Sequence, residues 1–303
     1  MMVFGWVLGA LAVVALGCFP YAVFIEQKQY KLRQIEIPIL PPGHPPIRLL
    51  HLADLHLLPS HTKKQSWVRA LAELKPDLVI NTGDNLGTVE AMPSLAAIFE
   101  PFASVPGVFV LGSNDIYASR PINPLKYFAP RRAVKNVPNL PTDELVAIMT
   151  SIGWASAEQQ RLVFTLQDTQ IEIRGCGDAH IRADDYPKVM GELSPQTDLL
   201  IGVTHAPYSH VLDLMVSDGT SLILTGHTHG GQVCLPGGRA LTTNCDLPTK
   251  QARGLSQHHC SSGSAYLHVS AGLGTSPYAP YRFCCPPEAS LITLVERPPQ
   301  NET

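Results

Sequence analysis

The feature that most constrains the fold is a series of short apolar runs that each end at a polar side chain. The runs are residues 48–53, 77–82, 108–111, 199–204 and 222–225. Continuous apolar segments of this length are typical of strands buried on both faces of a parallel sheet. A helical pattern over residues 63–74 follows the first run, and Pro76 ends it. This alternation predicts an α/β domain.

The polar residues that follow these runs are all types that can bind a metal ion. They are Asp54 and His56, then Asp84, Asn114, His205, and finally His227 and His229. In open α/β sheets, ligands bind outside the carboxyl ends of the strands. A single Asp after a strand is usually a turn residue or a helix cap, but five strand ends in series are hard to explain by chance. The sequence therefore predicts one composite metal site at one edge of a sheet.

The first 25 residues predict a membrane anchor. They contain no charged side chain, and about 20 apolar residues suffice to span a bilayer as a helix. No Lys or Arg precedes the apolar run, which disfavours a cleaved signal peptide. Because Lys28, Lys31 and Arg33 follow it, the positive-inside rule places the rest of the chain in the cytoplasm. We expect a single-pass protein of the cell membrane.

Composition and charge define the remaining regions. Residues 26–46 include five prolines between Pro38 and Pro46, which predicts a stiff linker and leaves residues 47–303 as the domain. A net charge of −3 gives no electrostatic footprint for nucleic acid. Seven cysteines in 303 residues do not form a disulfide framework.

The polar motifs, taken in order, resemble those of the calcineurin-like metallophosphoesterase family. They are Asp54-Leu55-His56, Gly83-Asp84-Asn85, Gly112-Ser113-Asn114-Asp115, Thr204-His205 and Gly226-His227-Thr228-His229. The Gly-Gly-Gln that follows the last motif is similar to the membrane-associated bacterial branch of that family. The resemblance covers residues 48–296 and implies a sandwich of two mixed β-sheets flanked by helices, here preceded by one transmembrane helix.

The resemblance also implies two divalent metal ions, which the donor types suggest are Mn, Fe or Zn. The first ion would be held by Asp54, His56 and His229, and Asp84 would bridge the two ions. His205, His227 and an amide oxygen of the third motif would hold the second. The implied reaction is hydrolysis of a phosphodiester or phosphomonoester by attack of a metal-bridging hydroxide on phosphorus.

The third motif departs from the family pattern Gly-Asn-His-Asp. Without a gap, Ser113 takes the place of the amide ligand. With one inserted serine, Asn114 is the ligand and Asp115 stands where the histidine should be. We favour the second reading because it retains an oxygen ligand, so Asn114 and Asp115 are our candidate catalytic residues. In either reading the histidine that contacts phosphate in the family is missing.

Arg282 is our candidate for binding the substrate phosphate, because arginine can bind phosphate through two parallel hydrogen bonds. A salt-bridging surface arginine is the equally weighted alternative. The expected partner is a phosphate ester, which the anchor would allow to be lipid-linked. The missing histidine motivates a second hypothesis, a non-catalytic metal-binding membrane protein on the same fold. A metallo-β-lactamase-like site is disfavoured because Gly230 and Gly231 follow His229.

Overall fold

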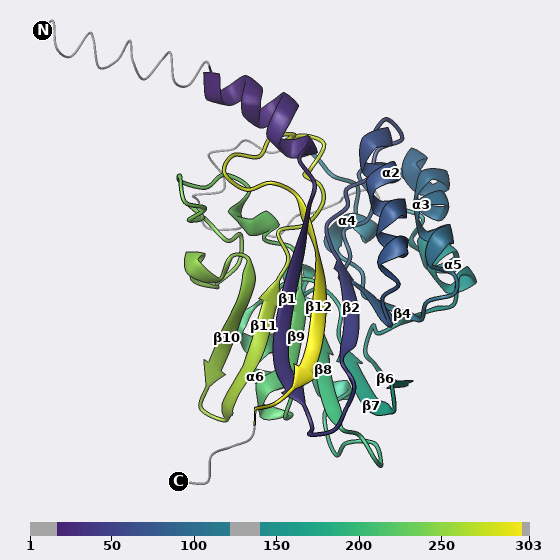
Figure 1. The fold of residues 1–303 in the computed structure, drawn as a ribbon. Helices are drawn as coiled ribbons and strands as arrows, with labels where there is room; N and C mark the ends of the chain where they lie inside the picture. The colour runs from purple at the N-terminus through teal and green to yellow at the C-terminus, as the bar shows by residue number, and fades with distance from the viewer. Residues whose placement is uncertain (1–16, 122–139, 299–303) are drawn as a thin grey trace, which may run out of the picture.

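The protein is a two-layer β-sandwich with helices on its outer faces (Figure 1). The structure is a computed structural model that describes residues 17–121 and 140–298. Each layer is a six-stranded sheet that mixes parallel and antiparallel pairs. The expected sandwich of two mixed sheets is therefore confirmed.

The first sheet has the strand order β1-β12-β2-β3-β4-β5. Its strands β2 to β5 are all parallel, and β12 is antiparallel to β2. The strands are β1 (Lys31–Leu40), β2 (Ile47–Leu52), β3 (Leu78–Asn81), β4 (Gly107–Phe109), β5 (Trp154–Ser156) and β12 (Glu288–Glu296).

The second sheet has the order β10-β11-β9-β8-β7-β6. Its four central strands are parallel, and an antiparallel hairpin partner closes each edge. The strands are β6 (Gln160–Leu166), β7 (Thr169–Gly175), β8 (Leu199–Val203), β9 (Leu222–Thr225), β10 (Gly254–Cys260) and β11 (Gly263–Val269).

Helices lie against both outer faces of the sandwich. The α-helices are α2 (Thr62–Ala70), α3 (Met92–Phe99), α4 (Ser113–Ile116), α5 (Thr142–Ser151) and α6 (Ser209–Ser217). Single helical turns are η1 (Tyr21–Ile25), η2 (Glu26–Lys28), η3 (Leu71–Leu74), η4 (Val89–Ala91), η5 (Glu100–Phe102), η7 (Ala179–Ile181), η8 (Tyr186–Lys188), η9 (His229–Gly231) and η10 (Thr249–Gln251).

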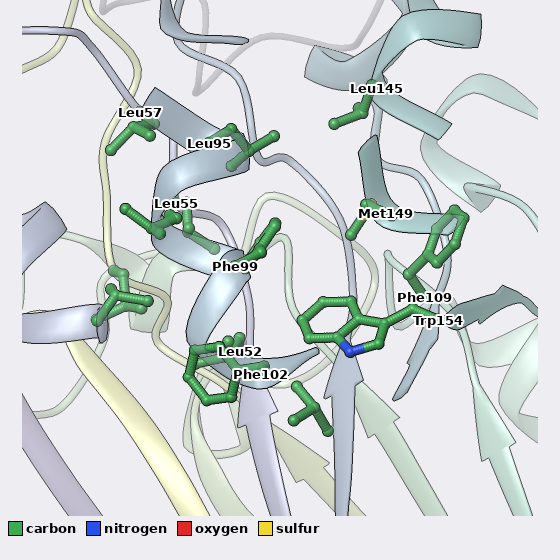
Figure 2. Close-up of a cluster of buried hydrophobic side chains, with 14 of the residues drawn as sticks. Leu52, Leu55, Leu57, Leu95, Phe99, Phe102, Phe109, Leu145, Met149 and Trp154 are labelled. Atoms are coloured by element: carbon green, nitrogen blue, oxygen red, sulfur yellow. The ribbon is translucent and has the colours of Figure 1, made fainter. Parts of the chain in front are cut away.

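The alternation of side chains along each strand divides the core into layers. Leu49 of β2 points between the sheets and packs with Ile201 of β8, whereas its neighbour Leu50 points to the helical side. Successive residues of a strand face opposite sides of the sheet, so one apolar run supplies both layers. Figure 2 shows the helical layer, where Phe99 of α3 lies 4.8 Å from Trp154 between ring centroids.

The predicted linker is wrong for residues 31–40, which form strand β1. This strand pairs in parallel with β12 along its length. Pro38 is tolerated because β1 is at the edge of the sheet, where one side of the strand needs no N–H donors. Ile35, Ile37 and Ile39 alternate and pack into the core between the sheets.

The predicted transmembrane helix over residues 1–25 falls mostly outside the described residues, which begin at residue 17. Residues 17–20 are helical and continue into η1 (Figure 1). In the described part of the chain, no helix combines the length and the hydropathy needed to cross a bilayer.

Candidate metal centre

The seven predicted ligands come together at one end of the sandwich. Each lies in a loop or turn that directly follows the carboxyl end of a strand. Asp54 and His56 follow β2, Asp84 follows β3, Asn114 follows β4, His205 follows β8, and His227 and His229 follow β9. The expectation of a single sheet edge needs one correction, because β2 to β4 belong to the first sheet and β8 and β9 to the second.

Four of these residues form a compact cluster. Ligand atoms of Asp54, His56, Asp84 and His229 all lie within 4.8 Å of one another. His56 Nε2 is 3.1 Å from His229 Nε2 and 3.4 Å from Asp84 Oδ2. Two imidazoles and two carboxylates converging on one point form a donor set that suits a divalent transition metal.

The imidazoles of this cluster are held in the form that binds metal. Burial lowers the pKa of His56 to about 4 and holds that of His229 well below its usual value, so both rings are neutral at pH 7. His229 donates its Nδ1 proton to the carbonyl oxygen of Gly274 at 3.1 Å. Its Nε2 lone pair therefore faces Asp54 Oδ1, 3.6 Å away.

His205 is oriented by the same kind of contact. Its Nδ1 donates to the carbonyl oxygen of Thr82 at 2.6 Å, and its Nε2 lies 3.5 Å from Asp84 Oδ2. This Nε2 is buried and makes no hydrogen bond within the described ranges. Burial alone would lower the pKa of this ring, but Asp84 and Asp178 raise it well above its usual value. A cation bound beside Asp84 would therefore replace a proton on this nitrogen.

Asn114, rather than Ser113, lies against the bridging carboxylate. Its backbone N–H donates to Asp84 Oδ1 at 2.7 Å and its Nδ2 to Asp84 Oδ2 at 2.8 Å. The Ser119 hydroxyl donates to Asn114 Oδ1 at 2.6 Å, and a hydroxyl can also accept. If the amide rotates, its NH₂ group can donate to Ser119, and its oxygen faces the site in place of the hydrogen bond to Asp84 Oδ2. This geometry supports the gapped reading of the third motif.

His227 lies beside His205 but makes different contacts. The two rings meet edge to face with centroids 5.2 Å apart. The backbone N–H of His227 donates to both oxygens of Asp54, at 3.0 and 3.1 Å. Its Nε2 is 3.3 Å from the carbonyl oxygen of Asn244, which leaves Nδ1 as the ring atom that could bind a second cation.

Five of the seven ligand residues have left-handed backbone conformations. The φ angles are 49° for Asp54, 40° for His56, 55° for Asp84, 68° for His227 and 51° for His229. This region costs a non-glycine residue about 1 kcal/mol or more. Sharp turns directly after the strands bring the side chains back over the sheet edge, and the strain is concentrated where the ligands converge.

Two glycines allow the loops to approach the carboxylates. A Cβ added at Gly112 would lie 2.2 Å from Asp84 Oδ1, and one at Gly226 would lie 2.6 Å from Asp54 Oδ2. The donors of the neighbouring motifs can therefore reach these oxygens only if both positions lack a side chain.

Comparison with known sequences agrees with this geometry. The profile of the calcineurin-like phosphoesterase family matches residues 47–231, more than half of the chain. The chain belongs to the calcineurin-like phosphoesterase family.

The sequences of several relatives align with most of the length of this calcineurin-like phosphoesterase. An uncharacterized metallophosphoesterase, YkuE of Bacillus subtilis, is 25% identical over 94% of both chains. The phosphodiesterase YaeI of Escherichia coli is 24% identical over 94% of this chain and 96% of its own. A transmembrane protein with metallophosphoesterase domain from Bos taurus is 26% identical over 66% of this chain and 44% of its own.

Asp115 of this calcineurin-like phosphoesterase is enclosed rather than directed at the cluster. Its carboxylate is fully buried and accepts from the backbone N–H groups of Asn85, Leu86 and Gly112 and from the Asn85 side chain. Burial, with Asp84 nearby, raises the pKa of Asp115 to about 7. A catalytic role for Asp115 stays a prediction, and its position counts against one.

Arg282 is inside the protein, and its role in binding the substrate phosphate stays a prediction that this position counts against. Its side chain is fully buried, and both terminal nitrogens donate to backbone carbonyls. One of these carbonyls, Gly274, also accepts the Nδ1 proton of His229. The alternative, a salt-bridging arginine at the surface, is wrong because the side chain is buried. The buried guanidinium instead holds the loop that orients a metal ligand.

Three further polar residues of this calcineurin-like phosphoesterase border the site. Asp178 and His180 follow β7, and the ring of His180 lies 4.5 Å from that of His227 between centroids. Glu158 follows β5 and accepts from the backbone N–H of Leu111 at 2.8 Å. Burial raises the pKa of Asp178 to about 6 and that of Glu158 to about 7. Asp178 and His180 could have been found from the Asp-Ala-His sequence that follows strand β7.

Proposed function

We propose that the protein is a dimetal phosphoesterase that hydrolyses a phosphodiester or a phosphomonoester. The observation that carries this proposal is the cluster of Asp54, His56, Asp84 and His229, whose ligand atoms lie within 4.8 Å. The residues of a second cation site, His205, His227 and Asn114, lie beside the same Asp84 or beside one another.

The donor set fits the two cations that the family implies. The neutral imidazoles of His56 and His229, the buried carboxylates and the Nε2 of His205 would all gain a partner. Burial raises the pKa of Asp54 to about 7, so this carboxylate needs a positive charge nearby to stay ionised at neutral pH. Divalent cations bound there supply activation of water and neutralisation of phosphate charge.

The chain's own residues prepare the site for such a reaction. Asp84 is central, because His56, His205 and Asn114 all contact its carboxylate. Thr82 and Gly274 fix the ring orientation of His205 and His229 through their carbonyl oxygens. Ligands held in this way bind metal with little reorganisation.

We further propose that the substrate is a phosphate ester reached from a membrane and that the domain faces the cytoplasm. The apolar residues 1–25 and the basic residues after them support this placement. The named relatives support it in part, since one is a phosphodiesterase and another a transmembrane protein.

The test compares two variants that each replace one carboxylate by an amide. Asp84→Asn removes the shared carboxylate, whereas Asp168→Asn alters an exposed residue of the β6–β7 hairpin, at the opposite end of the strands from the site. The purified full chain is loaded with Mn²⁺, its metal content is measured, and its hydrolysis of bis-p-nitrophenyl phosphate and p-nitrophenyl phosphate is assayed.

We expect two bound metals and turnover of at least one ester in the wild type and in Asp168→Asn. Asp84→Asn should lose metal and lower turnover by about 10²-fold or more. Two bound metals without turnover of either ester would instead favour the non-catalytic hypothesis. Full metal content and turnover in Asp84→Asn would refute the bridging role.

A further inference from the structure

A cavity with a positively charged lining lies next to the metal cluster. It has a volume of about 200 Å³ and lies between the N-terminal segment, the start of α2 and residues 273–275. Lys28, Lys63, Lys64 and His61 contribute to its wall, and none of the described residues that line it is acidic. A cavity of this charge favours an anionic ligand.

Lys64 is the least expected member of this lining. Its side chain is only 3% exposed, and its ammonium group donates to the carbonyl oxygen of Leu55 at 2.6 Å. No carboxylate of the described residues lies within ion-pair distance of it. Burying an ammonium group without a counter-charge is costly, so an anion in the cavity would supply the missing partner.

The surrounding charges repel one another. Burial, together with Lys64 and Lys28, lowers the pKa of His61 to about 4. Burial also lowers the pKa of Lys64 to about 7. At neutral pH the positive charge of the cavity therefore comes from Lys28 and Lys63 and, in part, from Lys64, while His61 is neutral. Such repulsion is relieved when an anion binds between the ammonium groups.

The cavity shares its walls with the metal cluster. Leu55, whose carbonyl oxygen accepts from Lys64, lies between the ligands Asp54 and His56 in the chain. Gly274 lines the cavity and accepts the Nδ1 proton of His229. An anionic group in the cavity would therefore lie next to the loop that carries Asp54 and His56 and next to Gly274, which orients His229.

Apolar side chains project into solvent just before the cavity in the chain. Phe19 and Phe24 are each 65% exposed and Ile25 is 51% exposed, and Lys28 follows three residues after Ile25. Exposed aromatic and aliphatic residues followed by lysines are typical of a segment at a membrane surface. In a chain bound to a membrane through these side chains, the cavity would lie at the level of the lipid headgroups.

We propose that this cavity binds the phosphate of an anionic phospholipid headgroup. The exposed apolar residues favour a lipid over a soluble phosphate, because they would contact the acyl chains while the lysines contact the headgroup. The proposal does not depend on the proposed hydrolysis, since binding needs neither metal nor turnover.

The test measures lipid binding by the full chain. The protein is purified in neutral detergent with EDTA, and its affinities for dihexanoyl phosphatidylglycerol, dihexanoyl phosphatidylcholine and glycerol 1-phosphate are compared by calorimetry. Lys28→Gln with Lys63→Gln removes two exposed charges of the cavity. Lys188→Gln with Lys250→Gln removes two exposed charges elsewhere and is the matched control. Circular dichroism melting verifies that both double variants are folded.

We expect phosphatidylglycerol to bind more tightly than the other two ligands. The cavity variant should lose about 30-fold in affinity, since each lysine near an anionic lipid contributes a factor of about five, and the control should lose little. Equal binding of phosphatidylcholine, or equal losses in both double variants, would overturn the proposal. Equal binding of glycerol 1-phosphate would overturn the lipid source and assign the cavity to a soluble phosphate.

Discussion

Asn114 contacts Asp84 through its backbone and its side chain at once, with distances of 2.7 and 2.8 Å to the two carboxylate oxygens. The start of α4 is thereby fixed to Asp84, which contacts three of the other six predicted ligands. The third motif, although it lacks the family's histidine, still delivers an amide to the site.

The first prediction separates the two readings of this motif. Asn114→Ala should weaken binding of the second metal by about 10-fold or more, because it removes an amide in contact with Asp84. Ser113→Ala should have little effect. The Ser113 hydroxyl accepts a long hydrogen bond of 3.5 Å from Asn114 Nδ2. Metal titration of both variants measures this difference. A larger loss in Ser113→Ala would support the ungapped reading.

The second prediction concerns Asp115. Replacing it with Asn puts an NH₂ group where a carboxylate oxygen accepts from N–H donors, including the backbone of Gly112. We expect Asp115→Asn to lower the free energy of unfolding by about 2–3 kcal/mol, measured by urea denaturation, with Asp168→Asn as the control. A variant of unchanged stability that loses more than 100-fold in turnover would instead make Asp115 catalytic.

The third prediction tests Arg282 as a positioning residue. Lysine cannot reproduce the fork whose Nη1 reaches the carbonyl oxygen of Cys285 and whose Nη2 reaches that of Gly274. Arg282→Lys should therefore weaken Mn²⁺ binding by about 10- to 100-fold while leaving the KM for a small phosphodiester nearly unchanged. Arg297→Lys is the control, because Arg297 also donates to a backbone carbonyl but is exposed beyond the end of β12. A raised KM with normal metal affinity would restore our original assignment to substrate binding.

The fourth prediction concerns acid stability. Burial alone would raise the pKa of Glu172, but hydrogen bonds from Ser194, Arg174 and Arg161 outweigh it and lower the pKa from 4.5 to about 2. Because the folded-state pKa is the lower one, the carboxylate stabilises the protein above pH 4.5 and loses this effect as the pH falls towards 2. Glu172→Gln should cost about 2 kcal/mol at pH 7.

The measurement for Glu172→Gln is urea denaturation between pH 7 and pH 3. The difference from the wild type should shrink as the pH falls. Glu73→Gln, which changes an exposed residue of η3, should show no such trend. A Glu172→Gln deficit that stays constant with pH would show that the carboxylate's charge does not contribute.

The interior strands and their ligands could be predicted because each apolar run and the polar residues after it are neighbours in the sequence. Residues 78–80 are apolar and are followed shortly by Gly83 and Asp84, so both the strand and its turn are evident. Strand β1 was missed because the prolines after it outweighed the alternation of Ile35, Ile37 and Ile39. Pro38 is compatible with an edge strand, but its place at the edge depends on β12, some 250 residues later.

The role of Arg282 could not be read from the sequence for a related reason. Its partners are backbone carbonyls of Ala271, Gly272 and Gly274, and every residue has a carbonyl. No residue type marks such a contact in advance. The enclosure of Asp115 likewise depends on N–H groups of the β3 loop, which approach it only in the folded chain.

The pairing of β1 with β12 has a consequence for the order in which the protein can fold during synthesis. Strand β1 has no other strand partner in its sheet, and Lys31 pairs with Glu288. When β1 leaves the ribosome, its partner has not yet been translated. The edge of the first sheet can therefore close only when nearly the whole chain has been made, and until then Ile37 and Leu40 remain without the core that buries them.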